Sequence, residues 1–393
     1  MSGAGAASRW SLLAGNFAIG CGVMVVPGSL NDLARSLSIS VAVGGQLITV
    51  AAVVMALGAP LLAAAVGGWD RRRLLALALV WYALGHALSA LMPDIASLTV
   101  ARGFCMLAAA VFTPQAAAAI GALAPPEQRA RAITFIFLGW SAASVFGMPL
   151  HAYIGESFGW RWAFALVAVL SLATAAWVWR AVPDGVRPPA LNMRAWKDVF
   201  THPVLMAIVA VTALSGAGQF TVFSYFAPYY RQVIGADAAQ ISILFAWFGA
   251  FGLLGNVLLS RYVDRIGAAR AVAVLLVAIA ASLLAWPWAI GVAAMAIVLV
   301  PWGFACFSSN SAQQARLGMA APALAPALMA LNTSAIYAGQ AIGAAGGGAI
   351  VLANEAAGRA TYAGLHWVGL AWIGVALATS LWAARRMQGR AHV

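Results

Sequence analysis

The chain has 393 residues, of which 64% are hydrophobic and only 8% are charged, and its formal net charge is +12. Soluble globular domains carry about a quarter charged residues, so this composition excludes an ordinary cytosolic enzyme, a disordered chain and a disulfide-rich secreted domain. The three cysteines, Cys21, Cys105 and Cys306, fall inside apolar runs and give no metal-ligand or disulfide spacing. We therefore predict an integral membrane protein, with no cofactor and no metal.

Twelve apolar stretches in the sequence are long enough to cross a bilayer as helices. A helix that crosses ~30 Å of hydrocarbon needs about 20 apolar residues, and the first stretch lacks the layout of a cleavable signal. The predicted fold is therefore all-α and integral to the membrane. In chain order the spans lie at roughly 10–28, 41–66, 73–92, 96–123, 132–154, 162–182, 203–226, 240–260, 270–289, 291–313, 326–352 and 363–383.

The basic residues between these stretches predict the orientation. With the N-terminus inside, most Lys and Arg residues fall in inner segments, few fall in outer ones, and Arg102 alone lies within a span. By the positive-inside rule, both termini are cytoplasmic. The positive charge is then an orientation signal, so we expect a bacterial-type inner (plasma) membrane location and no nucleic-acid partner.

The longest inner connection divides the chain into two halves of six spans each. It covers residues 183–202 and separates an N-terminal half, 1–182, from a C-terminal half, 203–393. Gly103 and Phe104 recur 200 residues later as Gly303 and Phe304, and several other glycines repeat at a similar offset. Two pseudo-symmetric halves are a known architecture of secondary transporters.

Three segments carry a family resemblance. Residues 255–267 read GNVLLSRYVDRIG, span five contains Gly147-Met148-Pro149 and leads into FGWRWAF, and span eleven contains GQAIGAAGG. Together they resemble the major facilitator superfamily, and within it the bacterial drug:proton antiporter branch that includes arabinose-efflux-like and chloramphenicol-resistance permeases. The resemblance implies twelve helices in two rocking halves.

The loop motif is the first candidate for gating. The resemblance implies that Asp264 and Arg265, followed by Gly267, form a charge latch at the inner side; a solvated loop pair is the alternative. In the first half Gly67 and Gly68 replace the Asp–Arg pair. There Asp70 is a candidate substitute for the missing acid, and Arg71 is either part of the latch or an inside anchor.

Small residues on spans five and eleven predict close helix packing. The glycines recur every four or eight residues, which places them on one helix face, and a proline adds a kink. Such helices suit a rocking interface between the halves; tight packing without motion is the alternative. These residues are Gly139, Gly147, Pro149, Gly339, Gly343 and Gly347.

Ionisable residues within the bilayer are functional candidates. Arg102 resembles the span-four arginine motif, which implies a role in proton coupling or anion attraction; snorkelling to the outer interface is the alternative. The antiporter branch often carries an acid in span one, where this sequence has Val23. Asp32 and His151 are therefore candidate proton sites, although an interfacial histidine is an alternative for His151.

Neutral polar residues on the inner helices are candidates for the cavity lining, although such residues also hold helices together. A lining with few charges favours neutral, amphipathic or weakly anionic solutes. The candidates are Asn16, Gln115, Gln219, Tyr225, Asn310, Asn332, Tyr337 and Gln340.

The predicted function is proton-coupled efflux of a small organic molecule (drug, sugar or metabolite) by alternating access. The alternative is a facilitator or importer of a small polar solute on the same fold, without proton antiport. The sequence contains no G-x-S-x-G, H-E-x-x-H or P-loop motif, which argues against an enzyme or an ATP-driven pump. We expect a monomer in the lipid bilayer, with the substrate and protons as its partners.

Overall fold

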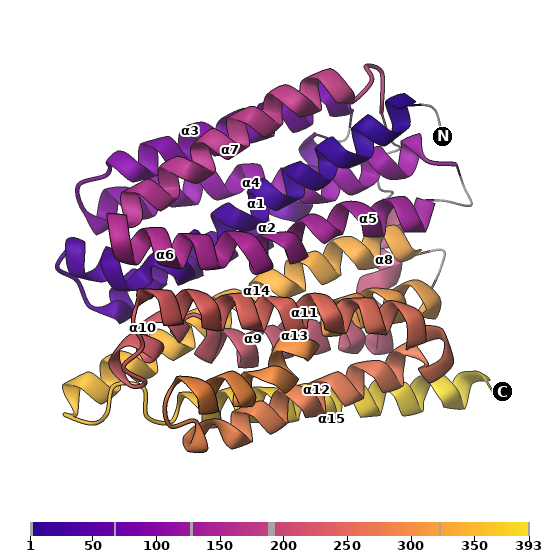
Figure 1. The fold of residues 1–393 in the computed structure, drawn as a ribbon. Helices are drawn as coiled ribbons and strands as arrows, with labels where there is room; N and C mark the ends of the chain where they lie inside the picture. The colour runs from indigo at the N-terminus through magenta and orange to yellow at the C-terminus, as the bar shows by residue number, and fades with distance from the viewer. Residues whose placement is uncertain (1–2, 67, 126–128, 188–192, 322–323, 392–393) are drawn as a thin grey trace.

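The computed structural model describes residues 3–66, 68–125, 129–187, 193–321 and 324–391. This part of the chain contains twelve helices long and apolar enough to cross a membrane, which confirms the predicted all-α fold and span number. Figure 1 shows the helices running side by side, with both termini at one end, here called the terminus end. The opposite end is called the distal end. That the terminus end faces the cytoplasm stays a prediction.

The first six spans form one bundle, in which the first span is kinked at Ser29 and the fifth is interrupted. Pro149 has no N–H to donate to the carbonyl four residues earlier, Val145. A π-helical segment occupies this place, as is common where a helix gains one unpaired residue. The spans are α1 (Gly3–Ser36), α2 (Val41–Ala65), α3 (Arg71–Leu91), α4 (Ile95–Leu123), the run of α5 (Arg129–Ala142), η2 (Ala143–Gly147) and α6 (Met148–Phe158), and α7 (Trp160–Ala181).

The last six spans form the second bundle, and a short helix, α8 (Met193–Phe200), precedes them. The seventh span is broken at Ser224 and Tyr225, because Pro228 cannot donate to the Ser224 carbonyl. The spans are α9 (Pro203–Phe223) with α10 (Phe226–Gln232), α11 (Ala238–Ile266), α12 (Ala268–Ala285) with η3 (Trp286–Trp288), α13 (Val292–Ala320), α14 (Ala325–Ala356) and α15 (Leu365–Ala391).

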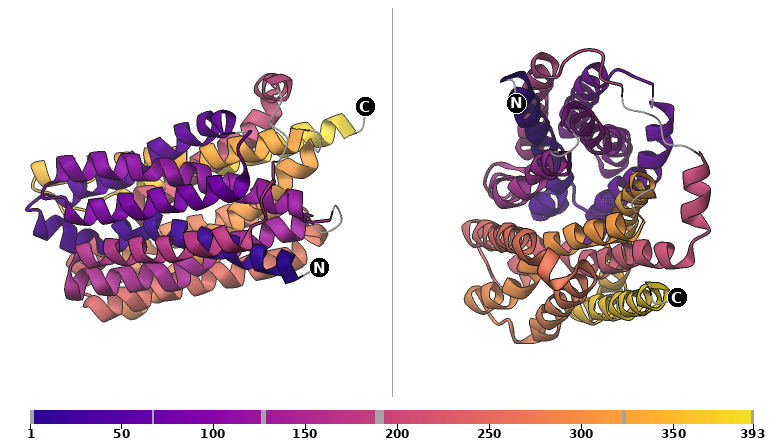
Figure 2. Two further views of the ribbon diagram at one scale, coloured as in Figure 1. Left: turned by 90° about the horizontal axis from the view of Figure 1, so that it is seen from above. Right: turned by 90° about the vertical axis from the view of Figure 1, so that its right-hand side faces the viewer.

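The two bundles meet in three places: α2 packs on α14, the fifth span (α5, η2 and α6) packs on α11, and α1 packs on α10. The right-hand view of Figure 2 shows the helices nearly end-on, with the indigo-to-magenta group beside the orange-to-yellow group. Some contacts here need glycine. A Cβ added at Gly249 would lie 2.7 Å from the Ser144 carbonyl oxygen of the other bundle.

The predicted glycine face packs within each bundle, and not between the bundles as a rocking interface would require. A side chain at Gly139 would collide with the Leu13 carbonyl of α1, and one at Gly339 would collide with the Ala213 carbonyl of α9. Span five therefore packs tightly on span one, and span eleven on span seven. Gly147, Gly343 and Gly347 make equally close contacts with Cys21, Ala217 and Thr221.

Candidate transport cavity and charged sites

A cavity of about 210 Å³ lies between the bundles, and most of its lining comes from the last six spans. Among the predicted cavity residues, Gln219, Asn310, Tyr337 and Gln340 line it. None of the described residues that line it is charged, so the cavity combines aromatic walls with amide and hydroxyl groups. The aromatic lining consists of Phe137, Trp140, Phe220, Phe223, Phe248, Trp302, Phe307 and Tyr337.

The other predicted cavity residues, Asn16, Gln115, Tyr225 and Asn332, do not line this cavity, although all are buried. Asn16 holds three helices of the first bundle together. Its Nδ2 donates to the Ile136 carbonyl at 3.1 Å, and its Oδ1 accepts from the Thr113 hydroxyl at 3.0 Å. Tyr225 donates to the Ala344 carbonyl at 3.0 Å.

Asn332 belongs to a similar polar node in the second bundle. Its Oδ1 accepts from the Thr212 hydroxyl at 2.6 Å, and Gln313 Nε2 donates to the Ile208 carbonyl at 2.9 Å. This node joins α9, α13 and α14, just as Asn16 joins α1, α4 and α5. Three-helix nodes of this kind hold the inner helices of each bundle in register.

The aromatic cluster beside the cavity was not among the predicted site residues. Trp302 Nε1 donates to Gln219 Oε1 at 3.0 Å, which orients both side chains toward the cavity. Phe226 packs between Trp286 and Trp302, with ring centroids 5.5 and 5.1 Å away. In sequence these residues resemble ordinary membrane aromatics, and only their spacing on neighbouring helices could have indicated a cluster.

Arg102 is buried inside the first bundle, with 1% of its surface exposed, so the snorkelling interpretation is wrong. Its Nη2 donates to the carbonyl oxygens of Gly22 at 3.0 Å and Val23 at 3.3 Å. Pro27 cannot donate to the Val23 carbonyl four residues before it. The guanidinium therefore replaces a backbone donor that α1 lacks. Among the described residues, its Nε and Nη1 have no hydrogen-bond partner.

Two histidines lie in the same bundle, both buried. His86 Nδ1 lies 3.0 Å from the Tyr82 carbonyl oxygen and 3.1 Å from Cys105 Sγ. Both ring nitrogens of His151 lack a partner among the described residues. The interfacial interpretation of His151 is therefore wrong, because its side chain does not reach the surface.

Asp32 has a structural role at the distal end. Its Oδ1 pairs with Arg35 at 2.7 Å, and its Oδ2 accepts the backbone N–H of Trp160 at 2.8 Å. The second contact fixes the start of α7 to the end of α1.

The first-half loop motif holds the segment that follows α7. Asp70 caps α3 by accepting the Arg73 N–H at 3.2 Å, and it also accepts the Gly185 N–H at 2.6 Å. The Arg71 N–H donates to the Val186 carbonyl at 3.0 Å. Burial raises the pKa of Asp70, but these backbone hydrogen bonds lower it by more, so the net pKa lies below its ordinary value.

The second-half loop motif lies at the terminus end of α11. Arg265 is exposed, and the side chain of Asp264 lies outside what the structure describes. Gly267, at φ +83°, joins α11 to α12 in a backbone conformation that favours glycine.

The comparisons with known proteins agree with this architecture. The family model of the Major Facilitator Superfamily matches residues 12–344. The chain is 28% identical over 347 residues to the inner membrane transport protein YdhP of Escherichia coli K12, covering 87% of this chain and 88% of that protein. It is 26% identical over 374 residues to the uncharacterized MFS-type transporter YbcL of Bacillus subtilis 168, covering 93% of each.

Two solved structures share the fold at low sequence identity. One is a bacterial homologue of the human lysosomal transporter Spinster, in an inward-facing and unoccupied conformation. It has a TM-score of 0.77 at 17% identity and covers 99% of this chain and 98% of that one. The other is a D-xylose–proton symporter, with a TM-score of 0.76 at 16% identity, covering 95% of this chain and 96% of that one.

The twelve spans and the bacterial relatives support a multi-pass protein of the bacterial inner membrane. A family model that matches most of the chain, together with relatives aligned over nearly their full length, settles the family. The chain belongs to the Major Facilitator Superfamily, whose members are secondary transporters.

Proposed function

We propose that this transporter exports small neutral organic molecules against proton entry, by alternating access. The observation that carries the proposal is the cavity between the bundles, whose described lining residues carry aromatic rings and amides but no charge. A charged solute would lose its hydration there without gaining an opposite charge, which is costly. A flat, neutral solute with hydroxyl or amide groups would instead stack on Trp302 and bond to Gln219 or Gln340.

Alternating access requires that the two bundles move as units. In our proposal residues 1–182 and 203–393 are the moving bodies, and 183–202 is the connection. Hydrogen bonds between the bundles gather at the distal end, where Asn31 Nδ2 donates to the Ala227 carbonyl at 3.1 Å and the Ser242 hydroxyl donates to the Pro149 carbonyl at 3.0 Å. This distal closure suits a state open toward the cytoplasm, if the termini are cytoplasmic.

The export direction rests on the resemblance to the drug:proton antiporter branch through the Gly147-Met148-Pro149 element. A facilitator or importer is the second candidate. It is favoured by the absence of a carboxylate among the cavity-lining residues that the structure describes. The fold accommodates this function too, since one structural neighbour is named a D-xylose–proton symporter.

Flux in proteoliposomes with an imposed pH gradient tests the proposal. Three labelled probes separate the classes: chloramphenicol as a neutral aromatic amide, D-xylose as a neutral polyol, and ethidium as an aromatic cation. We expect chloramphenicol to accumulate in exchange for protons, and ethidium not to. If D-xylose moves and its flux is unchanged when the gradient is collapsed, the facilitator is correct and the exporter is wrong.

A further inference from the structure

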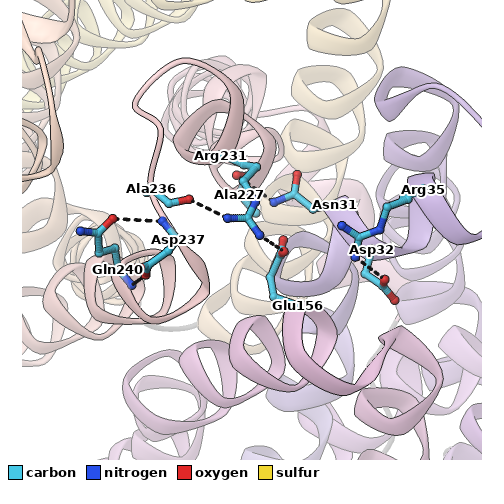
Figure 3. Close-up of polar contacts among 9 residues, drawn as sticks. All are labelled: Asn31, Asp32, Arg35, Glu156, Ala227, Arg231, Ala236, Asp237 and Gln240. Carbon is cyan, nitrogen blue, oxygen red and sulfur yellow. Dashed lines mark hydrogen bonds and ion pairs between the residues drawn. The ribbon is translucent and has the colours of Figure 1, made fainter.

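A buried ion pair joins the two bundles at the distal end. Glu156 Oε2 on α6 lies 2.9 Å from Arg231 Nη2 on α10. The Glu156 side chain is 1% exposed and that of Arg231 is 40% exposed, so the arginine lies between the carboxylate and the distal solvent. Figure 3 shows Arg231 reaching Glu156 with one arm and the Ala236 carbonyl with the other, at 3.1 Å.

The other charged groups around Glu156 have partners of their own. On α1, Asp32 is paired with Arg35, which also interacts electrostatically with Glu156. Asp237 caps α11 through the Gln240 N–H at 2.8 Å, and Arg161 of α7 donates to the Met92 carbonyl at 3.0 Å. On α6 itself the other titratable side chains are Tyr153, three residues away and exposed, and His151, five residues away and buried. Among the described acids at this end, Glu156 is therefore the one that bridges the bundles.

One oxygen of this carboxylate is unused. Glu156 Oε1 is buried and has no hydrogen-bond partner among the described residues. An ionised carboxylate can accept about four hydrogen bonds, so Oε1 offers a position at which a proton can bind without displacing Arg231 first. Protonation would remove the negative charge of the carboxylate, so the ion pair would become a weaker hydrogen bond from the still-charged Arg231 guanidinium to a neutral carboxyl oxygen.

We propose that Glu156 binds a proton from the distal side and that this protonation releases Arg231 and opens the distal closure. The inference rests on the proposed proton coupling and adds to it the group that senses the proton. A low distal pH favours the state in which the cavity faces that side.

The distance across the distal end, measured by double electron–electron resonance in lipid nanodiscs, tests this proposal without any substrate. Spin labels at Ala96 and Ala357, both exposed and on opposite bundles, report the opening. The three native cysteines are buried and are replaced by alanine. We expect the ratio of long to short distances to be higher at pH 5 than at pH 8.

The variant Glu156→Gln should give the long distance at both pH values, whereas Glu355→Gln, at an exposed distal glutamate, should behave like the parent. The double variant Glu156→Arg, Arg231→Glu exchanges the two charges, and it should show the same distal closure and the same pH response as the parent. A parent without a pH response, or a Glu156→Gln protein that keeps one, would overturn the proposal. Gradient-dependent flux of the parent separately decides the proposed function, so the two failures are distinguishable.

Discussion

Equivalent positions of the two bundles carry different chemistry. Arg102 and Trp302 lie 200 residues apart, as do His86 and Trp286. Each of the first pair reaches from the fourth helix of its bundle to the first: Arg102 binds the backbone of α1, and Trp302 binds the Gln219 side chain of α9. Trp302 lines the cavity and Arg102 does not.

Two prolines near the level of Arg102 and Trp302 show how the bundles differ in replacing a missing backbone donor. Pro27 in α1 and Pro228 in α10 each leave a carbonyl four residues earlier without its usual donor. In the first bundle Arg102 supplies a donor, and α1 is kinked just after the proline, where Ser29 has non-helical backbone angles (φ −103°, ψ 15°). In the second bundle Trp302 stands at the equivalent place, and the helix is interrupted with similar backbone angles at Tyr225 (φ −114°, ψ 14°). A buried arginine thus substitutes for a backbone amide, and the second bundle uses that space for aromatic groups.

The largest effect is expected at Arg102. Arg102→Ala leaves the Gly22 and Val23 carbonyls without this donor, at about 1–3 kcal/mol each. We expect gradient-driven flux to fall by roughly 30-fold or more, with the protein still inserted and monodisperse. Arg102→Lys, which keeps the charge but has fewer donors, should retain part of the flux. Normal flux in Arg102→Ala would show that the chemical difference between Arg102 and Trp302 has no role in transport.

Glycine substitutions at equivalent positions of the two bundles should destabilise the protein by similar amounts. Gly139→Ala and Gly339→Ala each place a methyl group against a backbone carbonyl. Overpacking of this kind costs about 1–3 kcal/mol, so both variants should lower the thermal midpoint in detergent by similar amounts. Gly346→Ala is the matched control, because no atom lies within 4 Å of its added Cβ. A lower thermal midpoint in only one of the two variants would show that the packing of span five on span one is not equivalent to that of span eleven on span seven.

Trp302→Phe sharpens the comparison from the cavity side. It removes the hydrogen bond to Gln219, about 0.5–1.5 kcal/mol, while keeping an aromatic ring. We expect a higher KM for the neutral aromatic probe with little change in maximal rate. Trp247→Phe serves as the control, since Trp247 donates to the Ala296 carbonyl away from the cavity. A change in proton coupling instead would contradict the division of roles.

The smallest effect is expected at Asp70. Asp70→Ala removes an N-cap, at about 0.5–2 kcal/mol, and should speed hydrogen exchange at Gly185, whereas Asp198→Ala should not. Because the pKa of Asp70 is lowered in the fold, its contribution is complete above the unfolded value of about 3.9 and is lost as the pH falls through the folded value. Exchange at Gly185, corrected for its intrinsic pH dependence, should therefore be unchanged between pH 8 and 5.

The number and order of the spans follow from hydropathy alone, since few other signals compete with twenty apolar residues. The interruptions are harder. Pro149 predicts a kink in span five, whereas the break in span seven depends on Pro228, which lies at the edge of the predicted span. Which group then replaces the lost backbone donor depends on another helix, here on Arg102 of α4, and the sequence does not supply that pairing.

The candidate site was only partly predictable, because contacts between helices decide it as well. Gln219 and Gln340 reach the cavity, whereas Asn16 and Asn332 bond to neighbouring helices. A polar residue on an inner helix has the same sequence signature in both cases, and the direction of its side chain is decided by packing. The Glu156–Arg231 pair joins residues 75 positions apart, and only their opposite charges at the same membrane end indicate a contact.

The connection between the bundles is tied at both of its ends. Asp70 and Arg71 bind Gly185 and Val186 to the first bundle, and Val199 of α8 is buried against residues of the second, among them Leu205 and Leu317. From Val186 to Met193 the chain has seven residue steps, which extend to at most about 25 Å. The length of this connection therefore sets an upper limit on how far one bundle can move relative to the other.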